Sequence, residues 1–196
     1  MPAMKDKSGA DIQGLCGQAL DWGASQAVAI PVSDIAVDER TSLKCLVPLC
    51  SHYKRNLLCP PQVIPPGQFR KILHRYHVAI LIRLEITLEE SLAASPDYLS
   101  VTRKSQLKLH ELIHRLESLC LEQGHHFAAG LIGGACPLCD ECVGVASRLP
   151  CRHPFRARPS MEAMGIDVVA TAGKAGMDIA FSRAGGRSWV GLVLVD

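Results

Sequence analysis

The sequence HVAILIRLEI, residues 77–86, is an apolar run of the length of one β-strand, and it predicts such a strand. A second apolar run, WVGLVLV at residues 189–195, predicts a buried strand that closes the chain. Helices are predicted on both sides of the first run. One follows Pro66 over residues 67–76, and a longer one extends from about Thr102 to Gln123 and stops at Gly124.

The remaining elements are shorter. They are a helix at 10–23, strands at 27–32, 34–37 and 126–132, and one or two short helices within 160–175. Helices that alternate with apolar strands predict an α/β or α+β sandwich. We therefore expect a single domain over residues 1–196, with a small mixed sheet, packed helices and two cysteine-rich loops at 44–66 and 133–159.

Composition is ordinary for a folded protein, with 48% apolar and 20% charged residues. The formal net charge of +2 is too small to predict nucleic acid or an anionic membrane as a partner. The first fifteen residues lack the apolar run of a secretory signal, and no run reaches the length of a membrane span. These features predict a cytoplasmic protein.

The chain contains nine cysteines, an odd number that argues against a framework of disulfides. In a reducing compartment, clustered cysteines more often bind metal or take part in redox chemistry. Cys16 and Cys120 lie within predicted helices, and Cys120 falls on an apolar stripe, which predicts a core thiol. The other seven lie in the two loops.

Cys136, Cys139 and Cys142 follow one another at intervals of three residues, and Cys151 comes after eight further residues. Such spacing lets one loop wrap around a [4Fe-4S] cluster and offer thiolates to separate irons. A structural zinc site more often uses two separated Cys-x2-Cys pairs. The spacing therefore favours an iron–sulfur cluster, with zinc as the alternative.

The first loop supplies three further thiols, at Cys45, Cys50 and Cys59. Two conventional clusters need eight thiolates, and the loops together supply seven. Three arrangements remain open: a non-cysteine ligand such as His52 completes a second site, one cluster keeps an open coordination position, or a single larger cluster uses both loops.

A basic run surrounds the last cysteine and consists of Arg148, Arg152, His153, Arg156 and Arg158. These side chains could offset the negative charge of a thiolate-bound cluster or form a solvated surface. The alternative function for them is to bind an anion or a redox partner. Ser160 is placed to cap a following helix.

His110, Glu111 and His114 match the H-E-x-x-H pattern of zinc proteases. On a helical wheel both histidines fall roughly 100 to 140 degrees away from the apolar stripe, which predicts a solvated position for them. Glu117 and Cys120 stand where the extended metzincin pattern has glycine and histidine, and a third ligand would have to be Glu141 or Glu162. A protease is therefore the weaker interpretation.

Three stretches carry a resemblance to a known family. They are VSDIAVDERTSLKCLVPLCSHYKRNLLCPP, FRKIL and CPLCDECVGVASRLPCRHPFRARPSMEAMGIDVVAT. The chain resembles, from about residue 25 to 195, the "predicted metal-binding protein" family of bacteria and archaea, a cysteine-rich domain of unknown function. The resemblance implies metal binding, with iron–sulfur chemistry expected. Its pattern includes seven cysteines of this chain, namely Cys45, Cys50, Cys59, Cys136, Cys139, Cys142 and Cys151.

Three functions follow as hypotheses. The leading one is an iron–sulfur protein that carries electrons for a redox partner protein, either as a monomer or as a homo-oligomer. The second is an enzyme whose cluster has an open iron acting as a Lewis acid or redox centre. The third is a structural zinc protein. The sequence contains no phosphate-binding glycine loop and no Cys-x3-Cys-x2-Cys motif of radical enzymes.

Overall fold

The centre of the molecule is a four-stranded sheet with the strand order β1-β2-β4-β3. A computed structural model describes residues 10–86, 98–179 and 187–196. The strands are β1 (Gln26–Pro31), β2 (Val78–Ile86), β3 (Ala129–Leu131) and β4 (Arg187–Val195). Each adjacent pair is antiparallel, with Ile80 of β2 opposite Ala29 of β1 and Val193 of β4.

The described residues form five α-helices and three short 3-10 turns. The helices are α1 (Ala10–Asp21), α2 (Leu43–Leu46), α3 (Pro66–Leu73), α4 (Tyr98–Glu122) and α5 (Val168–Lys174). The 3-10 turns span Val32–Asp34, Glu39–Ser42 and Val145–Ser147. Gly124 follows α4 with a φ of 96°, a left-handed conformation that favours glycine and ends the helix.

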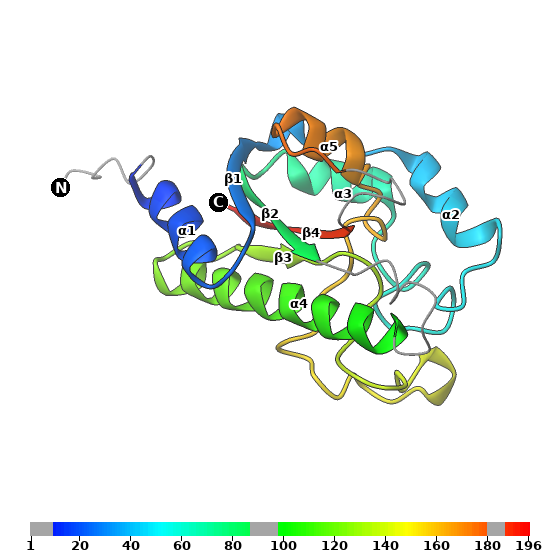
Figure 1. Cartoon of the computed structure of the whole chain (residues 1–196). Coiled ribbons are helices and arrows are strands. Elements are labelled where there is room, and N and C mark those ends of the chain that lie inside the picture. Colours follow the sequence, from blue (N-terminus) through cyan, green and yellow to red (C-terminus); the bar gives the residue numbers. More distant parts are fainter. Residues whose placement is uncertain (1–9, 87–97, 180–186) are drawn as a thin grey trace.

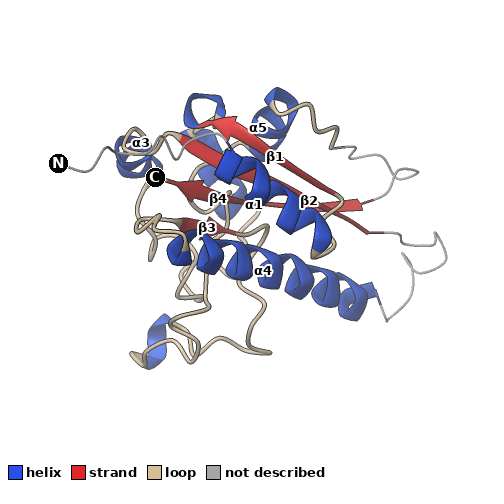
Figure 2. Ribbon diagram, turned by 90° about the vertical axis from the view of Figure 1, so that its left-hand side faces the viewer, coloured by secondary structure: helices blue, strands red, loops and turns tan. Residues whose placement is uncertain are grey.

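Helices cover both faces of the sheet (Figures 1 and 2). Helices α1 and α4 lie on one face, and α3 and α5 lie on the other. Because side chains of a strand alternate between faces, Ile80 and Ile82 join the core under α4, while Ala79 and Leu81 join the core under α3 and α5. Covering on both faces explains why the five successive residues 78–82 are all apolar.

Close approach of α4 to the sheet depends on two glycines. A Cβ atom at Gly130 of β3 would lie 2.6 Å from Cγ2 of Ile113, and one at Gly191 of β4 would lie 3.0 Å from the same side chain. Ile113 of α4 is fully buried. A larger residue at either position would push α4 away from the sheet.

The predicted α+β fold is confirmed. The helix predicted at 67–76 is α3, the helix predicted from 102 is α4, and the two apolar runs are β2 and β4. The ladders of the described sheet are antiparallel rather than mixed. One parallel pairing exists as an isolated bridge between Ile132 and Ser160.

Several shorter elements differ from expectation. Residues 34–37 form no strand, because a 3-10 turn occupies Val32–Asp34 and only Val37 forms a bridge, to Ile166. The strand predicted at 126–132 is limited to Ala129–Leu131. Within 160–175 one helix forms, α5, which agrees with the prediction of one or two. The hydroxyl of Ser160 accepts a hydrogen bond from the amide of Ala163 at 3.0 Å and caps a turn rather than a helix.

The two cysteine segments meet beside the sheet, at the right-hand side of Figure 1. The amide of Val145 donates a hydrogen bond to the carbonyl of Arg55 at 3.0 Å and so joins them directly. Gly144 has a φ of 74°, and a Cβ atom there would lie 3.1 Å from the same carbonyl. Segments about 90 residues apart in sequence are thereby placed side by side.

Candidate metal centre

The second cysteine segment is fastened to α4 on both sides of its cysteines. Nε2 of Gln106 donates to the carbonyls of Gly133 and Ala135, at 2.9 Å and 2.7 Å, just before Cys136. After Cys151, the guanidinium of Arg158 forms an ion pair with Glu117 of α4, and both side chains are largely buried. Between these two anchors the chain turns back on itself and carries the cysteines.

All four cysteines of this segment line one small cavity. The cavity has a volume of about 20 Å³. Its walls also contain His153 from the same segment and residues 56–58 from the first segment. The four thiols that the spacing singled out, Cys136, Cys139, Cys142 and Cys151, are therefore brought together, as a loop that wraps around a centre requires.

Two backbone amides point at the sulfurs. The amide of His153 donates to Sγ of Cys151 at 3.3 Å, and the amide of Leu138 donates to the sulfur of Cys136. In both cases the donor lies two residues after the cysteine. Hydrogen bonds of this kind stabilise a thiolate and orient it as a ligand.

Burial is the main electrostatic influence on Cys136 and raises the pKa of its thiol. The hydrogen bond from Leu138 opposes this shift, and the neighbouring thiols add to it. Several thiolates so close together repel one another, so a cation must neutralise them if they are to be deprotonated at neutral pH.

The first segment brings its three cysteines close to the second. Cys45 lies in α2, and its carbonyl accepts a hydrogen bond from the amide of Cys50 at 3.1 Å. Cys59 is buried, and burial raises the pKa of its thiol to about 12. The further causes of that shift are, in descending order, the thiols of Cys50, Cys45, Cys136 and Cys142. Cys59 is thus the point at which the two groups of thiols interact.

The donor set fits a metal that prefers sulfur, because thiolates select zinc, copper(I) and iron–sulfur clusters. As they stand, no three His, Cys, Asp or Glu side chains within the described ranges form a group that could hold a metal ion. The cavity has room for about one water molecule. A single ion matches that size, whereas a [4Fe-4S] cubane is larger than the cavity as it stands.

Arginines of the basic run also hold the segment in place. Besides the Arg158–Glu117 pair, Arg156 binds Glu111 of α4 at 2.6 Å, and Arg152 donates to the carbonyl of Glu141 at 2.8 Å. Arg148 is exposed. Pairing with α4 was not predicted, because the partners lie about 40 residues earlier in the sequence.

The prediction of a solvated position for His110 and His114 is wrong. His110 is 0% exposed, and His114 is half-buried. The segment that carries Arg156 and Arg158 folds over this flank of α4, which a helical wheel cannot reveal. Neither ring nitrogen of His110 has a hydrogen-bond partner in the described part of the chain. Glu111, the residue that a zinc protease would use as its base, is instead paired with Arg156.

The other candidates take different places. Cys16 and Cys120 are buried in the core between the sheet and α4, as predicted for Cys120. His52 is exposed on the first segment, whereas His153, which sequence reasoning assigned only to the basic run, lines the cysteine cavity. Its position two residues after Cys151 was the one sequence feature that could have identified it.

Comparison with known proteins identifies the family. The sequence model of the family described as "Predicted metal-binding protein (DUF2284)" matches residues 28–195, which include all seven loop cysteines. The chain belongs to this family. Comparison with curated proteins gave no match, and neither did comparison with solved structures. In the described residues, no helix combines the length and the apolar character that a membrane crossing needs.

Replacement of one cavity cysteine and, in parallel, of one core cysteine should distinguish metal ligands from structural thiols. We expect Cys139→Ser to lower the bound metal per chain sharply, because one thiolate of the set is lost. Cys120→Ala should retain the metal and lower the free energy of unfolding by about 1 kcal/mol, as expected for a small core truncation. Metal analysis and urea unfolding of both variants measure these effects, and equal metal retention would contradict the assignment.

His110 should make the stability depend on pH. Burial, followed by the charges of Arg158, Arg156 and His114, lowers the pKa of His110 from 6.5 to about 4. Between these two pKa values, the unfolded chain carries a proton on His110 that the folded chain does not. The free energy of unfolding therefore falls as the pH drops from about 6.5 to 4.

Urea unfolding of the unaltered protein and of His110→Leu, from neutral pH down to pH 4, measures this effect. Both proteins lose metal in acid, so this contribution cancels when their free energies of unfolding are subtracted at each pH. We expect a shallower pH dependence for His110→Leu, while replacement of the exposed His126 by Gln should change nothing. Parallel pH profiles for His110→Leu and the unaltered protein would refute the assignment.

Proposed function

We propose that this protein holds an iron–sulfur cluster on Cys136, Cys139, Cys142 and Cys151 and transfers electrons to or from a partner protein. The observation that carries the proposal is the convergence of these four thiols on one cavity. Their spacing is typical of a loop around a cubane rather than of paired zinc-binding knuckles. A bound [4Fe-4S] cluster would supply reversible one-electron transfer.

The surroundings suit a redox centre. Leu57, Leu58 and Leu138 line the cavity beside the sulfurs and would keep water away from them. The amides of Leu138 and His153 donate to two of the four sulfurs. Apolar cover and amide hydrogen bonds are the means by which proteins adjust the potential of such a centre.

A second centre is proposed for Cys45, Cys50 and Cys59. The electrostatic influence of Cys50, Cys45, Cys136 and Cys142 on Cys59 supports a centre that adjoins the first one, or one larger cluster that uses both segments. His153 lines the cavity of the four-thiol centre, so it would serve as a non-cysteine ligand only in a larger cluster that uses both segments. The seven thiols are otherwise divided four and three, which leaves the second centre one cysteine short of four.

The partner is proposed to bind where the cysteine segments reach the surface. Phe155 and Leu149 are 87% and 59% exposed, and they flank the cavity cysteine Cys151 in sequence. Arg148 and Arg152 are exposed in the same stretch. Apolar side chains surrounded by positive charge suit a redox protein with an acidic surface, and a short path to the cluster would favour electron transfer.

A second function has one observation in its favour. A cleft borders Cys45: its lining includes Lys44, the preceding residue, and Glu162. Burial, followed by the thiol of Cys50 and the carboxylate of Glu162, raises the pKa of the Cys45 thiol. A centre with three thiolates and an open iron beside such a cleft would suit an enzyme. A structural zinc protein is the third candidate, supported by the small volume of the cavity.

Redox titration followed by electron paramagnetic resonance tests the leading proposal. Protein purified without oxygen should show a spectrum that appears on one-electron reduction and disappears on reoxidation. Cys142→Ser should abolish or shift this spectrum, and Cys16→Ala, a core control, should leave it unchanged. A centre that cannot be reduced at any accessible potential would contradict electron transfer. A shift of the spectrum by a small exogenous ligand would favour the enzyme instead.

A further inference from the structure

The first cysteine segment exposes a group of apolar side chains. The amide of Cys50 donates to the carbonyl of Cys45 and closes a loop whose residues, Leu46–Leu49, are all exposed. The exposed fraction reaches 75% at Val47, and Leu43, which precedes the loop on α2, is 58% exposed. Single exposed apolar residues are common, whereas four large ones within seven residues are typical of a binding surface.

These apolar side chains do not stabilise the core. No residue of α2 is buried, and in the described chain no residue from 43 to 49 belongs to either core cluster. The segment lies at the right-hand edge of Figure 1, away from the sheet. Because apolar surface in water is unfavourable in proportion to its area, these side chains gain free energy only if something outside the domain covers them.

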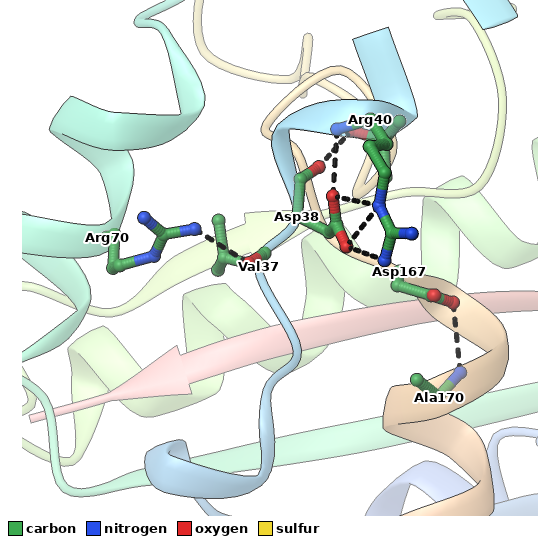
Figure 3. Close-up of polar contacts among 7 residues, drawn as sticks. Val37, Asp38, Arg40, Arg70, Asp167 and Ala170 are labelled. Carbon is green, nitrogen blue, oxygen red and sulfur yellow. Dashed lines mark hydrogen bonds and ion pairs between the residues drawn. The ribbon is translucent and has the colours of Figure 1, made fainter. Parts of the chain in front are cut away.

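The base of this segment is fixed to the rest of the domain (Figure 3). The amide of Asp38 donates to the carbonyl of Gly165 at 2.8 Å. Arg40 pairs with the carboxylate of Asp38 at 2.5 Å, and Arg70 of α3 donates to the carbonyl of Val37 at 2.8 Å. The apolar loop is therefore presented from an ordered base, and both of these arginines are already engaged.

The stretch that contains the loop is strongly basic. From residue 40 to residue 84 the chain has no aspartate or glutamate and eight basic residues, namely Arg40, Lys44, Lys54, Arg55, Arg70, Lys71, Arg75 and Arg83. The formal net charge of +2 therefore consists of +8 in this stretch and −6 in the rest of the chain. Such an asymmetry, which the small net charge conceals, is typical of a protein that binds an anionic partner.

Three of these cations adjoin the apolar loop. Lys44 lies in α2, and Lys54 and Arg55 lie in the hydrogen-bonded turns that follow Cys50. All three side chains are exposed, and none of them forms an ion pair within the residues that the structure describes. Attraction between exposed charges acts over about 10 Å at ordinary ionic strength, so these cations can act together on an extended anionic surface.

We propose that this loop docks on the surface of an anionic lipid bilayer. The four apolar side chains enter the boundary between headgroups and acyl chains, while Lys44, Lys54 and Arg55 pair with headgroup phosphates. Lipid is favoured over a protein partner because the loop has no aromatic residue, and leucine and valine are under-represented among the residues that dominate protein interfaces. Docking of this kind needs no membrane-spanning helix and does not depend on which metal the cysteines hold.

Sedimentation with lipid vesicles tests the proposal on the protein as purified, with its metal bound. Vesicles of equal parts phosphatidylcholine and phosphatidylglycerol are compared with vesicles of phosphatidylcholine alone. We expect binding to the mixed vesicles to be more than about tenfold tighter, because each basic residue near an anionic surface strengthens binding about fivefold. Added salt should weaken binding to the mixed vesicles, since it screens exposed charges.

Apolar variants test insertion of the loop. Val47→Asn combined with Leu49→Asn should weaken binding to the mixed vesicles about tenfold, and Leu43→Asn, outside the loop, should act in the same direction. Phe127→Asn is the matched control and should leave binding unchanged. Phe127 is 73% exposed but lies beside the C-terminal Asp196, well to the left of α2 in Figure 1.

Charge variants test the contribution of the cations. Lys44→Gln combined with Lys54→Gln should weaken binding to the mixed vesicles about twentyfold and leave the weak binding to phosphatidylcholine unchanged. Lys108→Gln, which removes an exposed charge of α4, should alter neither. Metal per chain is measured for every variant, because the altered positions adjoin Cys45 and Cys50.

The proposal is overturned if the protein binds neither kind of vesicle, if it binds both equally, or if the control variants weaken binding as much as the loop variants. Poly-L-glutamate is titrated in parallel as an acidic polymer without lipid. Binding to this polymer alone would overturn the membrane surface in favour of an acidic protein. A protein that proves to contain zinc would contradict electron transfer and leave the vesicle result intact, so the two failures are distinguishable.

Discussion

The contact between α4 and the second cysteine segment sets the position of that segment's sulfurs. Gln106 holds the backbone ahead of Cys136, and the buried ion pair between Arg158 and Glu117 holds it after Cys151. α4 in turn is fixed to the sheet, where Gly130 and Gly191 let Ile113 approach closely. Rigid elements that hold both ends of a loop allow the loop itself to carry ligands without losing its place. Loss of one partner of the Arg158–Glu117 pair would leave a charge without compensation, which makes this contact more sensitive than the exposed pairs.

Electrostatics link the two cysteine segments. The buried thiol of Cys59 is disfavoured as a thiolate by its own burial and by thiols from both segments. Such a group of thiols is ionised at neutral pH when a metal supplies positive charge, so metal binding and the arrangement of the segments are expected to depend on each other. The Val145–Arg55 hydrogen bond shows that the segments are in contact through their backbones as well.

Much of the fold could be predicted from local pattern. The apolar runs at 77–86 and 189–195 and the stripe of α4 are long and regular, and each formed the expected element. The antiparallel order of the sheet could not be predicted, because pairing depends on contacts between distant residues. For the same reason His110 was misplaced: the segment that covers it begins some forty residues later. Cysteine spacing identified the four thiols that share the cavity, whereas His153 joined them only through the three-dimensional arrangement.

The most direct test of the account is the amount of iron, zinc and acid-labile sulfide per chain in protein purified without oxygen. Iron with a matching amount of sulfide is the predicted result, and its quantity would distinguish one cubane from two or from a larger cluster. Zinc without sulfide would contradict the account and make the cysteine segments a structural or catalytic zinc site.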